Sequence, residues 1–282
     1  MVNMLNFLIV DEIIRNALKE DGPYGDVTVS SIVSPFERAK ADLIAKEDGI
    51  ICGLKVFKRV FEILGEVEVE FLVKDGDQVN NSMVIGRVIG NAQNILIGER
   101  IALNLLQRMS GIATLTNKYV KKLEGLNTKI LDTRKTTPNL RALEKYAVKI
   151  GGGVNHRFSL SDGILIKDNH IGYAGSIKEA VKLARNNSSF IRKIEIEVET
   201  EKQVIEALEA GADIIMLDNM TPNLARDMVK LIDGRAITEC SGNVTLDTVL
   251  EYGKTGVDYI SSGELTHSVK AFDISLKNLR KI

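Results

Sequence analysis

Four basic side chains lie where the chain is predicted to turn, within the stretch of residues 131–171. Arg134 and Lys135 follow one short apolar run. Arg157 comes shortly after three consecutive glycines, and Lys167 ends a second apolar run. Charges on a surface helix usually alternate in sign, whereas these cations gather at turns. Because an arginine fork binds carboxylate or phosphate through two parallel hydrogen bonds, this arrangement predicts a pocket for a compact polyanion.

Two glycine-bearing turns follow the last two predicted strands. One holds Ser241, Gly242 and Asn243, and the other holds Ser262 and Gly263. In α/β barrels the corresponding turns often bind phosphate through backbone N–H groups. Glycine allows the backbone to approach such a ligand closely. The two turns therefore predict a phosphate site.

Glu197 and Asp218 end two neighbouring predicted strands. Paired carboxylates near a phosphate site suit Mg²⁺ that is held partly by substrate oxygens. They also suit the stabilisation of positive charge that develops on a sugar. The sequence contains no histidine and cysteine cluster with zinc spacing and no Ser-His-Asp signature. The pair therefore fits either a metal ion held with substrate oxygens or positive charge on a sugar.

Several of these residues have other interpretations. Lys167 at a desolvated strand end could form a Schiff base, as in an aldolase. Asp218 could cap a helix, and Glu195 or Glu199 could face solvent. A phosphate-binding sensor on the same scaffold is a third interpretation, although two carboxylates beside phosphates argue against a pure anion binder.

The elements that must position these residues follow from the alternation of apolar strands with amphipathic helices after residue 125. We expect strands at residues 130–132, 163–167, 194–198, 214–218, 236–239 and 259–261. We expect helices at residues 140–150, 177–186, 201–210, 222–230 and 246–252. This order predicts a parallel sheet that closes, or nearly closes, into an α/β barrel. In such barrels the active site lies at the carboxyl ends of the strands.

The first part of the chain has a different pattern. Short strands with period two surround a helix at residues 53–64, which predicts a small α/β layer with a structural role. A long helix is expected at residues 95–123, with a kink or break at Ser110-Gly111. We place a first domain at residues 1–108 and the barrel at 109–268. The tail, residues 269–282, could pack on the first domain.

Composition limits the class of protein and its partners. The 282 residues carry a net charge of −1, which argues against a nucleic-acid partner. No apolar run approaches the roughly 20 residues of a membrane span. Residues 4–19 are expected to form an amphipathic helix, not a signal peptide. With only Cys52 and Cys240, far apart in sequence, the cytoplasm is the expected location.

Nine motifs together resemble quinolinate phosphoribosyltransferase, also called nicotinate-nucleotide pyrophosphorylase (carboxylating). They are EDGPYGDVT, ERIALNLLQRMSGIAT, LDTRKTTP, GGGVNHRFSLSD, LIKDNH, IEVE, IMLDN, ECSGN and ISSGELTHS. The resemblance implies an N-terminal α/β sandwich followed by an irregular, incomplete α/β barrel of the TIM type. It also implies transfer of phosphoribosyl from phosphoribosyl pyrophosphate to quinolinate with Mg²⁺, giving nicotinate mononucleotide, pyrophosphate and CO₂ in de novo NAD synthesis.

The resemblance also implies roles for single residues. The quinolinate carboxylates would be held by Arg100, Arg134, His156, Arg157 and Lys167. The phosphates would be held by Lys135, Ser241, Gly242, Asn243, Ser262 and Gly263. Glu197 and Asp218 would bind the ribose hydroxyls and Mg²⁺, so the catalytic set is Lys135, Lys167, Glu197 and Asp218. The family forms dimers or larger homo-oligomers, in which Arg100 would reach the neighbouring active site, and His267 would fix the last loop.

One alternative lies within the same superfamily, namely its molybdenum-transport-associated branch. That branch shares much of the barrel pattern. The residues expected to clamp quinolinate are all present here, which favours the transferase.

Overall fold

The computed structural model describes residues 5–282, which divide into two units. Unit 1 contains the chain up to residue 117 together with residues 136–152 and 266–282. Unit 2 contains residues 118–135 and 153–265. Unit 1 therefore takes in a piece of the middle of the chain and the C-terminal tail.

Unit 1 is built on an antiparallel sheet with strand order β12-β1-β5-β3. The strands are β1 (Arg38–Ala45), β3 (Val67–Phe71), β5 (Val84–Asn91) and β12 (Ile274–Lys281), with a separate pair β2 (Gly49–Ile50) and β4 (Gln78–Val79). Its helices are α1 (Phe7–Asp21), α2 (Val27–Ile32), α3 (Leu54–Leu64), most of α4 (Ala92–Lys122), α5 (Arg141–Ile150) and part of α11 (Glu264–His267). Alternate residues of β1 are buried, as expected for a sheet with one face on a core.

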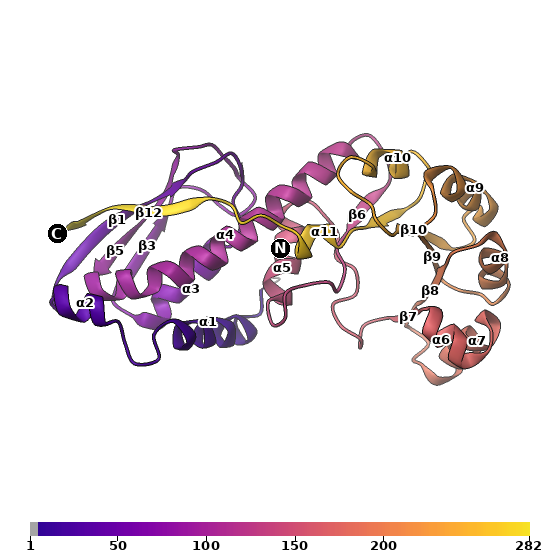
Figure 1. Cartoon of the computed structure of the whole chain (residues 1–282), viewed down its shortest axis with the longest axis horizontal. Helices are drawn as coiled ribbons and strands as arrows, with labels where there is room; N and C mark the ends of the chain where they lie inside the picture. Colours follow the sequence, from indigo (N-terminus) through magenta and orange to yellow (C-terminus); the bar gives the residue numbers. More distant parts are fainter. Residues whose placement is uncertain (1–4) are drawn as a thin grey trace. The chain divides into compact units, whose positions relative to one another are not determined.

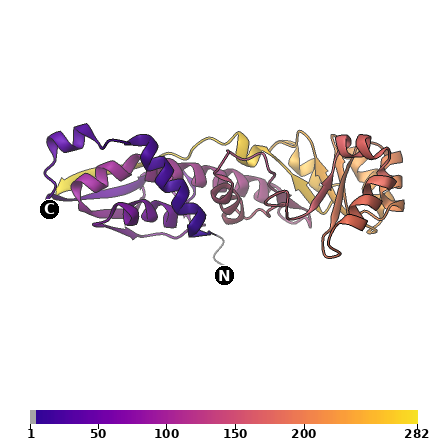
Figure 2. The same ribbon diagram turned by 90° about the horizontal axis from the view of Figure 1, so that it is seen from below.

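The C-terminal tail joins this sheet beside a strand from the first part of the chain. Strand β12, from the C-terminal tail, pairs antiparallel with β1, and Figure 2 shows its yellow ribbon beside the indigo strands. At the other end, α1 forms where the sequence predicts an amphipathic helix. Met4, the first residue of that prediction, lies outside the described residues. Among residues 5–282, no helix is both long and apolar enough to cross a membrane.

Of the kink or break predicted at Ser110-Gly111, the break is wrong, because α4 continues without interruption from Ala92 to Lys122. The Ser110 hydroxyl accepts the Cys52 N–H at 3.0 Å and donates to the Cys52 carbonyl at 3.1 Å. At Gly111 a side chain would collide with the carbonyl of Lys270. Serine and glycine are therefore used here to let other backbone segments approach the helix, and not to end it.

Unit 2 is a parallel sheet with strand order β6-β11-β10-β9-β8-β7. Its strands are β6 (Lys129–Leu131), β7 (Ile164–Ile166), β8 (Ile194–Val198), β9 (Ile214–Asp218), β10 (Ile237–Ser241) and β11 (Tyr259–Ser261). Its helices are α6 (Asp168–Ala174), α7 (Ile177–Asn187), α8 (Glu201–Glu209), α9 (Pro222–Ile232) and α10 (Val249–Gly253). Figure 1 shows α8 and α9 on the outer side of the strands.

The sheet stays open between β6 and β7, which confirms the predicted incomplete barrel. Each strand from β7 to β11 pairs with the next one, and β6 pairs only with β11 among the strands. On its other side β6 meets a loop: the Val154 N–H donates to the Ile130 carbonyl at 2.9 Å. The Asp132 N–H donates back to the Val154 carbonyl at 3.2 Å. The segment just before His156 therefore lies alongside β6 at this edge of the sheet.

Candidate active site

Lys167 and Glu197 form an ion pair at the carboxyl ends of β7 and β8, with Nζ 2.5 Å from Oε2. The neighbouring strand β9 ends at Asp218. Burial raises the pKa of the Asp218 carboxyl, the Glu197 charge raises it further, and the Lys167 charge opposes this. Two carboxylates that repel each other are the donor set that a hard cation stabilises. The residues thus fit the predicted Mg²⁺.

The turn after β10 approaches the end of β9 closely. Gly242 has φ +93°, and a side chain on it would collide with the side-chain oxygen of Asn219. The Asn219 N–H donates to the Ser241 carbonyl at 3.0 Å, and Asn219 itself has φ 53°. Asn243, which follows, also has a positive φ of 52°. This turn depends on glycine at position 242, because glycine has no Cβ to collide with Asn219 and adopts a positive φ without strain.

The turn after β11 is tied to its neighbours. The Ser262 hydroxyl donates to the Val244 carbonyl at 3.0 Å, and the backbone N–H of Ser262 donates to the Leu131 carbonyl at 3.1 Å. The residue is buried, with 4% of its surface exposed. Ser262 therefore joins the ends of β6 and β11 to the loop after β10. Its predicted contact with phosphate, like that of Ser241, stays a prediction.

Asp132, directly after β6, organises the loop that carries His156. Its side chain is fully buried. One carboxylate oxygen accepts the His156 N–H at 2.8 Å, and the other accepts the Asn155 side-chain amide at 2.7 Å. A carboxylate that accepts two such donors holds the backbone of the loop in one position.

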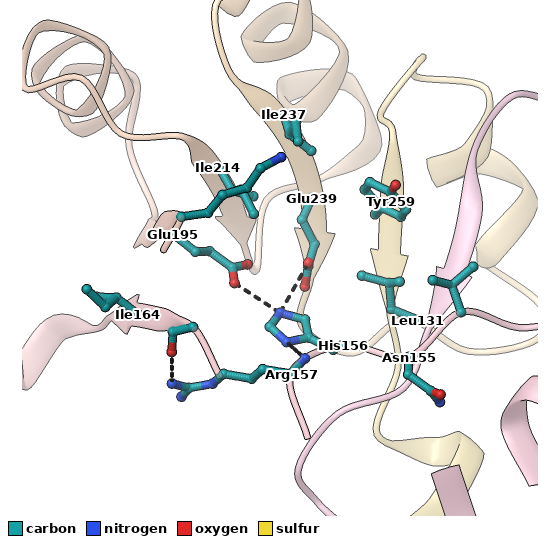
Figure 3. A pocket seen from close by; sticks show the side chains of 13 residues that line it. Leu131, Asn155, His156, Arg157, Ile164, Glu195, Ile214, Ile237, Glu239 and Tyr259 are labelled. Carbon is teal, nitrogen blue, oxygen red and sulfur yellow. Dashed lines mark hydrogen bonds and ion pairs between the residues drawn. The ribbon is translucent and has the colours of Figure 1, made fainter. Parts of the chain in front are cut away.

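His156 meets two buried carboxylates inside the half-barrel (Figure 3). Its Nε2 lies 3.0 Å from Oε2 of Glu195 and 3.5 Å from Oε2 of Glu239. Glu195 and Glu239 are 4% and 2% exposed. Burial, followed by the Glu195 charge, raises the pKa of Glu239. The three side chains line a pocket of about 270 Å³ whose other walls include Ile214, Ile237 and Tyr259.

Arg157 connects this cluster to the other cations. Its N–H donates to Nδ1 of His156 at 2.7 Å, and its guanidinium donates to the Gly163 carbonyl at 3.0 Å. Burial and the nearby Arg134 charge lower the pKa of Arg157. Two guanidinium groups close enough to affect each other make a strongly positive patch that favours an anion.

The structure thus brings together in unit 2 most of the residues that the sequence singles out. Arg100 is an exposed residue of α4 in unit 1, and His267, in α11, has its Nδ1 2.5 Å from the Ser268 hydroxyl. The solvent-facing interpretation of Glu195 is wrong, since the residue is buried against His156. Sequence reasoning missed the cluster that Glu195 and Glu239 make with His156. The signal that could have found it was period two in β8, which puts Glu195 on the same face as Glu197.

Ionisable side chains at the carboxyl ends of an incomplete barrel define an α/β-barrel enzyme. Two family models match the chain: the quinolinate phosphoribosyl transferase N-terminal domain over residues 26–110 and its C-terminal domain over residues 112–277. The chain belongs to the quinolinate phosphoribosyl transferase family.

Relatives from bacteria and archaea agree with this assignment. A probable nicotinate-nucleotide pyrophosphorylase (carboxylating) of Bacillus subtilis is 48% identical over 273 residues, covering 96% of this chain and 94% of the relative. A protein of the same name from Methanocaldococcus jannaschii is 45% identical and covers 95% of this chain and 97% of the relative. The crystal structure of NadC from Streptococcus pyogenes matches with a TM-score of 0.95 at 44% identity, over 99% of each chain.

These findings support the transferase interpretation rather than its alternatives. Both relatives are named for the pyrophosphorylase, not for molybdenum transport. The aldolase alternative needs a neutral amine on Lys167 as nucleophile. In the structure this amine is 45% exposed and pairs with Glu197, whereas a Schiff-base lysine needs a desolvated position.

Proposed function

We propose that this chain transfers the phosphoribosyl group of phosphoribosyl pyrophosphate to the ring nitrogen of quinolinate. The products are nicotinate mononucleotide, pyrophosphate and CO₂. The observation that carries the proposal is the alignment of Lys167, Glu197 and Asp218 at adjacent strand ends. The ammonium group of Lys167, which can bind a quinolinate carboxylate, thus lies next to two carboxylates that can act on the ribose.

The quinolinate carboxylates fit the positive side of this site. Burial, and after it the charge of the nearby Arg134, lowers the pKa of Arg157. Lys167 is 45% exposed and can turn toward a ligand. Two adjacent carboxylates on a small ring need several donors within a few ångströms, and planar guanidinium groups supply them in pairs. His156 is also predicted to contact quinolinate, but its ring nitrogens lie within hydrogen-bond distance of the Arg157 N–H and of Glu195, so its part in binding would be indirect.

The phosphate groups fit the turns after the last two strands. Gly242 and Gly263 would let backbone N–H groups approach a phosphate, with Ser241, Asn243 and Ser262 beside them. Lys135, an exposed residue after β6, would bind the pyrophosphate. The sequence alone assigns these contacts, and in the structure Gly242 and Asn243 both have positive φ, as in a tight turn.

Glu197 and Asp218 would act at the anomeric carbon. As the bond from this carbon to pyrophosphate breaks and the bond to the ring nitrogen forms, positive charge develops on the sugar, and the two carboxylates stabilise it. Glu197 and Asp218 would also hold Mg²⁺, which would supply positive charge for the leaving pyrophosphate. The cationic ring nitrogen then accepts the electron pair of the breaking carbon–carboxylate bond, CO₂ leaves and a proton takes its place.

A homodimer, or a larger homo-oligomer, would complete the site. Tyr24, Ile32 and Phe36 in unit 1 are 99%, 76% and 92% exposed. Large apolar side chains this exposed, close in sequence, would be covered if another chain packed on this part of unit 1. We place Arg100 of one copy at the quinolinate carboxylates of the other. For the location of the protein we propose the cytoplasm, which the free buried thiols of Cys52 and Cys240 support.

Product analysis tests the function directly. With carboxyl-labelled quinolinate, phosphoribosyl pyrophosphate and Mg²⁺, the purified chain should release labelled CO₂ and form nicotinate mononucleotide in equal amounts. Removal of Mg²⁺ with a chelator should abolish turnover, and its return should restore it. Asp218→Asn should reduce kcat, whereas Asp227→Asn on the exposed surface of α9 should not. Absence of CO₂ release by the folded wild-type chain would refute the proposal.

A further inference from the structure

Both ring nitrogens of His156 are engaged by groups with defined roles. The backbone N–H of Arg157 can only donate, so the Nδ1 atom that it meets at 2.7 Å must offer a lone pair. The ring proton is then on Nε2, which lies 3.0 Å from Oε2 of Glu195. The hydrogen bonds therefore select one neutral tautomer of His156 and make Glu195 its acceptor.

The surroundings of Glu195 strengthen this arrangement. The carboxylate is 4% exposed, and a charge buried to this degree is retained only with good partners. Glu239 lies on the other side of the ring, with Oε2 3.5 Å from Nε2. Burial and the Glu195 charge raise the pKa of Glu239, and of the two carboxylates Glu195 lies closer to the ring nitrogen. Glu195 is thus the group that holds the ring.

Holding the ring also fixes the next residue. The His156 ring accepts the N–H of Arg157, and the His156 N–H is itself held by Asp132 at 2.8 Å. The backbone at the start of Arg157 therefore has two anchors, one through the main chain and one through the imidazole. From there the guanidinium of Arg157 reaches the Gly163 carbonyl at 3.0 Å.

We propose that Glu195, with Glu239 beside it, is a positioning residue of the transferase: it holds the His156 imidazole in its Nε2–H form and thereby places Arg157 for the substrate carboxylate. The part of this inference that concerns substrate rests on the proposed function. Neither glutamate needs to touch substrate for this role. The inference adds a layer of residues behind the cationic patch.

Histidine spectra test the arrangement without any catalysis. The chain has three histidines, so ¹⁵N-histidine labelling gives few signals, which His170→Asn and His267→Asn variants assign. We expect His156 at pH 7 to carry its proton on Nε2 with Nδ1 as an acceptor. A proton on Nδ1, or a ring that exchanges freely between tautomers, would overturn the inference. This measurement needs only the wild-type fold and the two assignment variants.

Paired variants then test the link to substrate. Glu195→Leu removes the acceptor and should raise KM for quinolinate at least about tenfold, equivalent to about 1.4 kcal/mol. KM for phosphoribosyl pyrophosphate should stay within about twofold, because the phosphate turns follow β10 and β11 and the substitution leaves Glu197 in place. Glu195→Gln keeps an acceptor oxygen and should retain both the tautomer and the quinolinate KM. Equal rises in both KM values, or no rescue by Gln, would contradict the positioning role.

Thr238→Val is the matched control. Thr238 is buried on β10 next to Glu239, and its hydroxyl bonds Asp258 at 2.8 Å. This variant should lose stability but keep the His156 spectrum and the quinolinate KM. If wild-type protein forms no nicotinate mononucleotide, the proposed function fails, and the spectra still decide whether Glu195 holds His156.

Discussion

Arg108 donates from Nε and Nη2 to the same oxygen of Glu144, at 3.1 and 2.8 Å. The Glu144 side chain has no exposed surface, and its second oxygen accepts the Thr137 N–H at 3.1 Å. Arg108 also donates to the Thr266 carbonyl. Arg108 and Glu144 therefore connect α4 and α5 to the loop at Thr137, two residues after Lys135, and to Thr266.

Arg108→Met should destabilise the chain by about 3–5 kcal/mol, because it leaves the buried Glu144 carboxylate without its countercharge. Urea unfolding followed by circular dichroism measures this change. Arg59→Met is the control, since Arg59 and its partner Asp11 are 32% and 24% exposed, and its loss should cost about 1 kcal/mol or less. If both variants lose the same free energy of unfolding, the burial of Glu144 does not explain the stabilisation by Arg108.

Glu239 makes stability depend on pH. Its pKa in the folded chain lies above the ordinary value of about 4.3 of the unfolded chain. Between these two values the folded state holds one proton more than the unfolded state, so the free energy of unfolding falls as pH rises. The slope of the unfolding free energy against pH that this carboxyl adds approaches about 1.4 kcal/mol per pH unit. The slope vanishes below the ordinary pKa, where Glu239 is protonated in both the folded and the unfolded state.

Glu239→Gln removes this titration, so its free energy of unfolding should fall less steeply between pH 5 and 7 than that of the wild type. Unfolding in urea at several pH values gives the slopes. Glu199→Gln, an exposed position after β8, should keep the wild-type slope. Parallel curves for wild type and Glu239→Gln would mean that Glu239 ionises normally in the folded chain.

The strands of unit 2 follow from the sequence because each carries its own signal. The predicted bounds of β8, β9 and β11 agree with the structure residue for residue. Strand β12 is different: its partner β1 lies more than 200 positions away, and five of its eight residues are exposed, so no local apolar pattern marks it. Helix α10 begins three residues later than predicted, since a turn from Thr245 to Thr248 precedes it.

The candidate site divides in the same way. Residues at strand ends, such as Glu197 and Asp218, are predictable because parallel strands end at one edge. His156 comes from a loop, and its direction depends on Asp132 and on backbone pairing with β6. Neither contact leaves a trace in residue spacing. The sequence therefore supplied the histidine but not its contact with Glu195.

Gly242→Ala should reduce the affinity for phosphoribosyl pyrophosphate at least about tenfold, because the turn must move away from Asn219 to admit a methyl group. The measurement is KM for this substrate beside KM for quinolinate. Gly175→Ala separates strain from collision: Gly175 has φ +92°, close to the +93° of Gly242, but a methyl group added there would meet no atom within 4 Å. If both variants weaken binding of phosphoribosyl pyrophosphate equally, the loss comes from backbone strain at a positive φ and not from the collision with Asn219.

Arg100 and Arg157 test whether the site is shared between copies. Arg157→Ala should lower kcat/KM by about 30-fold to 700-fold, corresponding to about 2–4 kcal/mol for a lost charged hydrogen-bond partner. Arg100→Ala should also be impaired. In a mixed dimer of the two variants, one of the two sites combines an intact Arg157 with an intact Arg100 from the other copy. Random exchange of equal amounts makes half of the dimers mixed, so about a quarter of the wild-type activity should return. Activity that stays at the level of the separate variants, after exchange is verified by mass, would place Arg100 outside the neighbouring site.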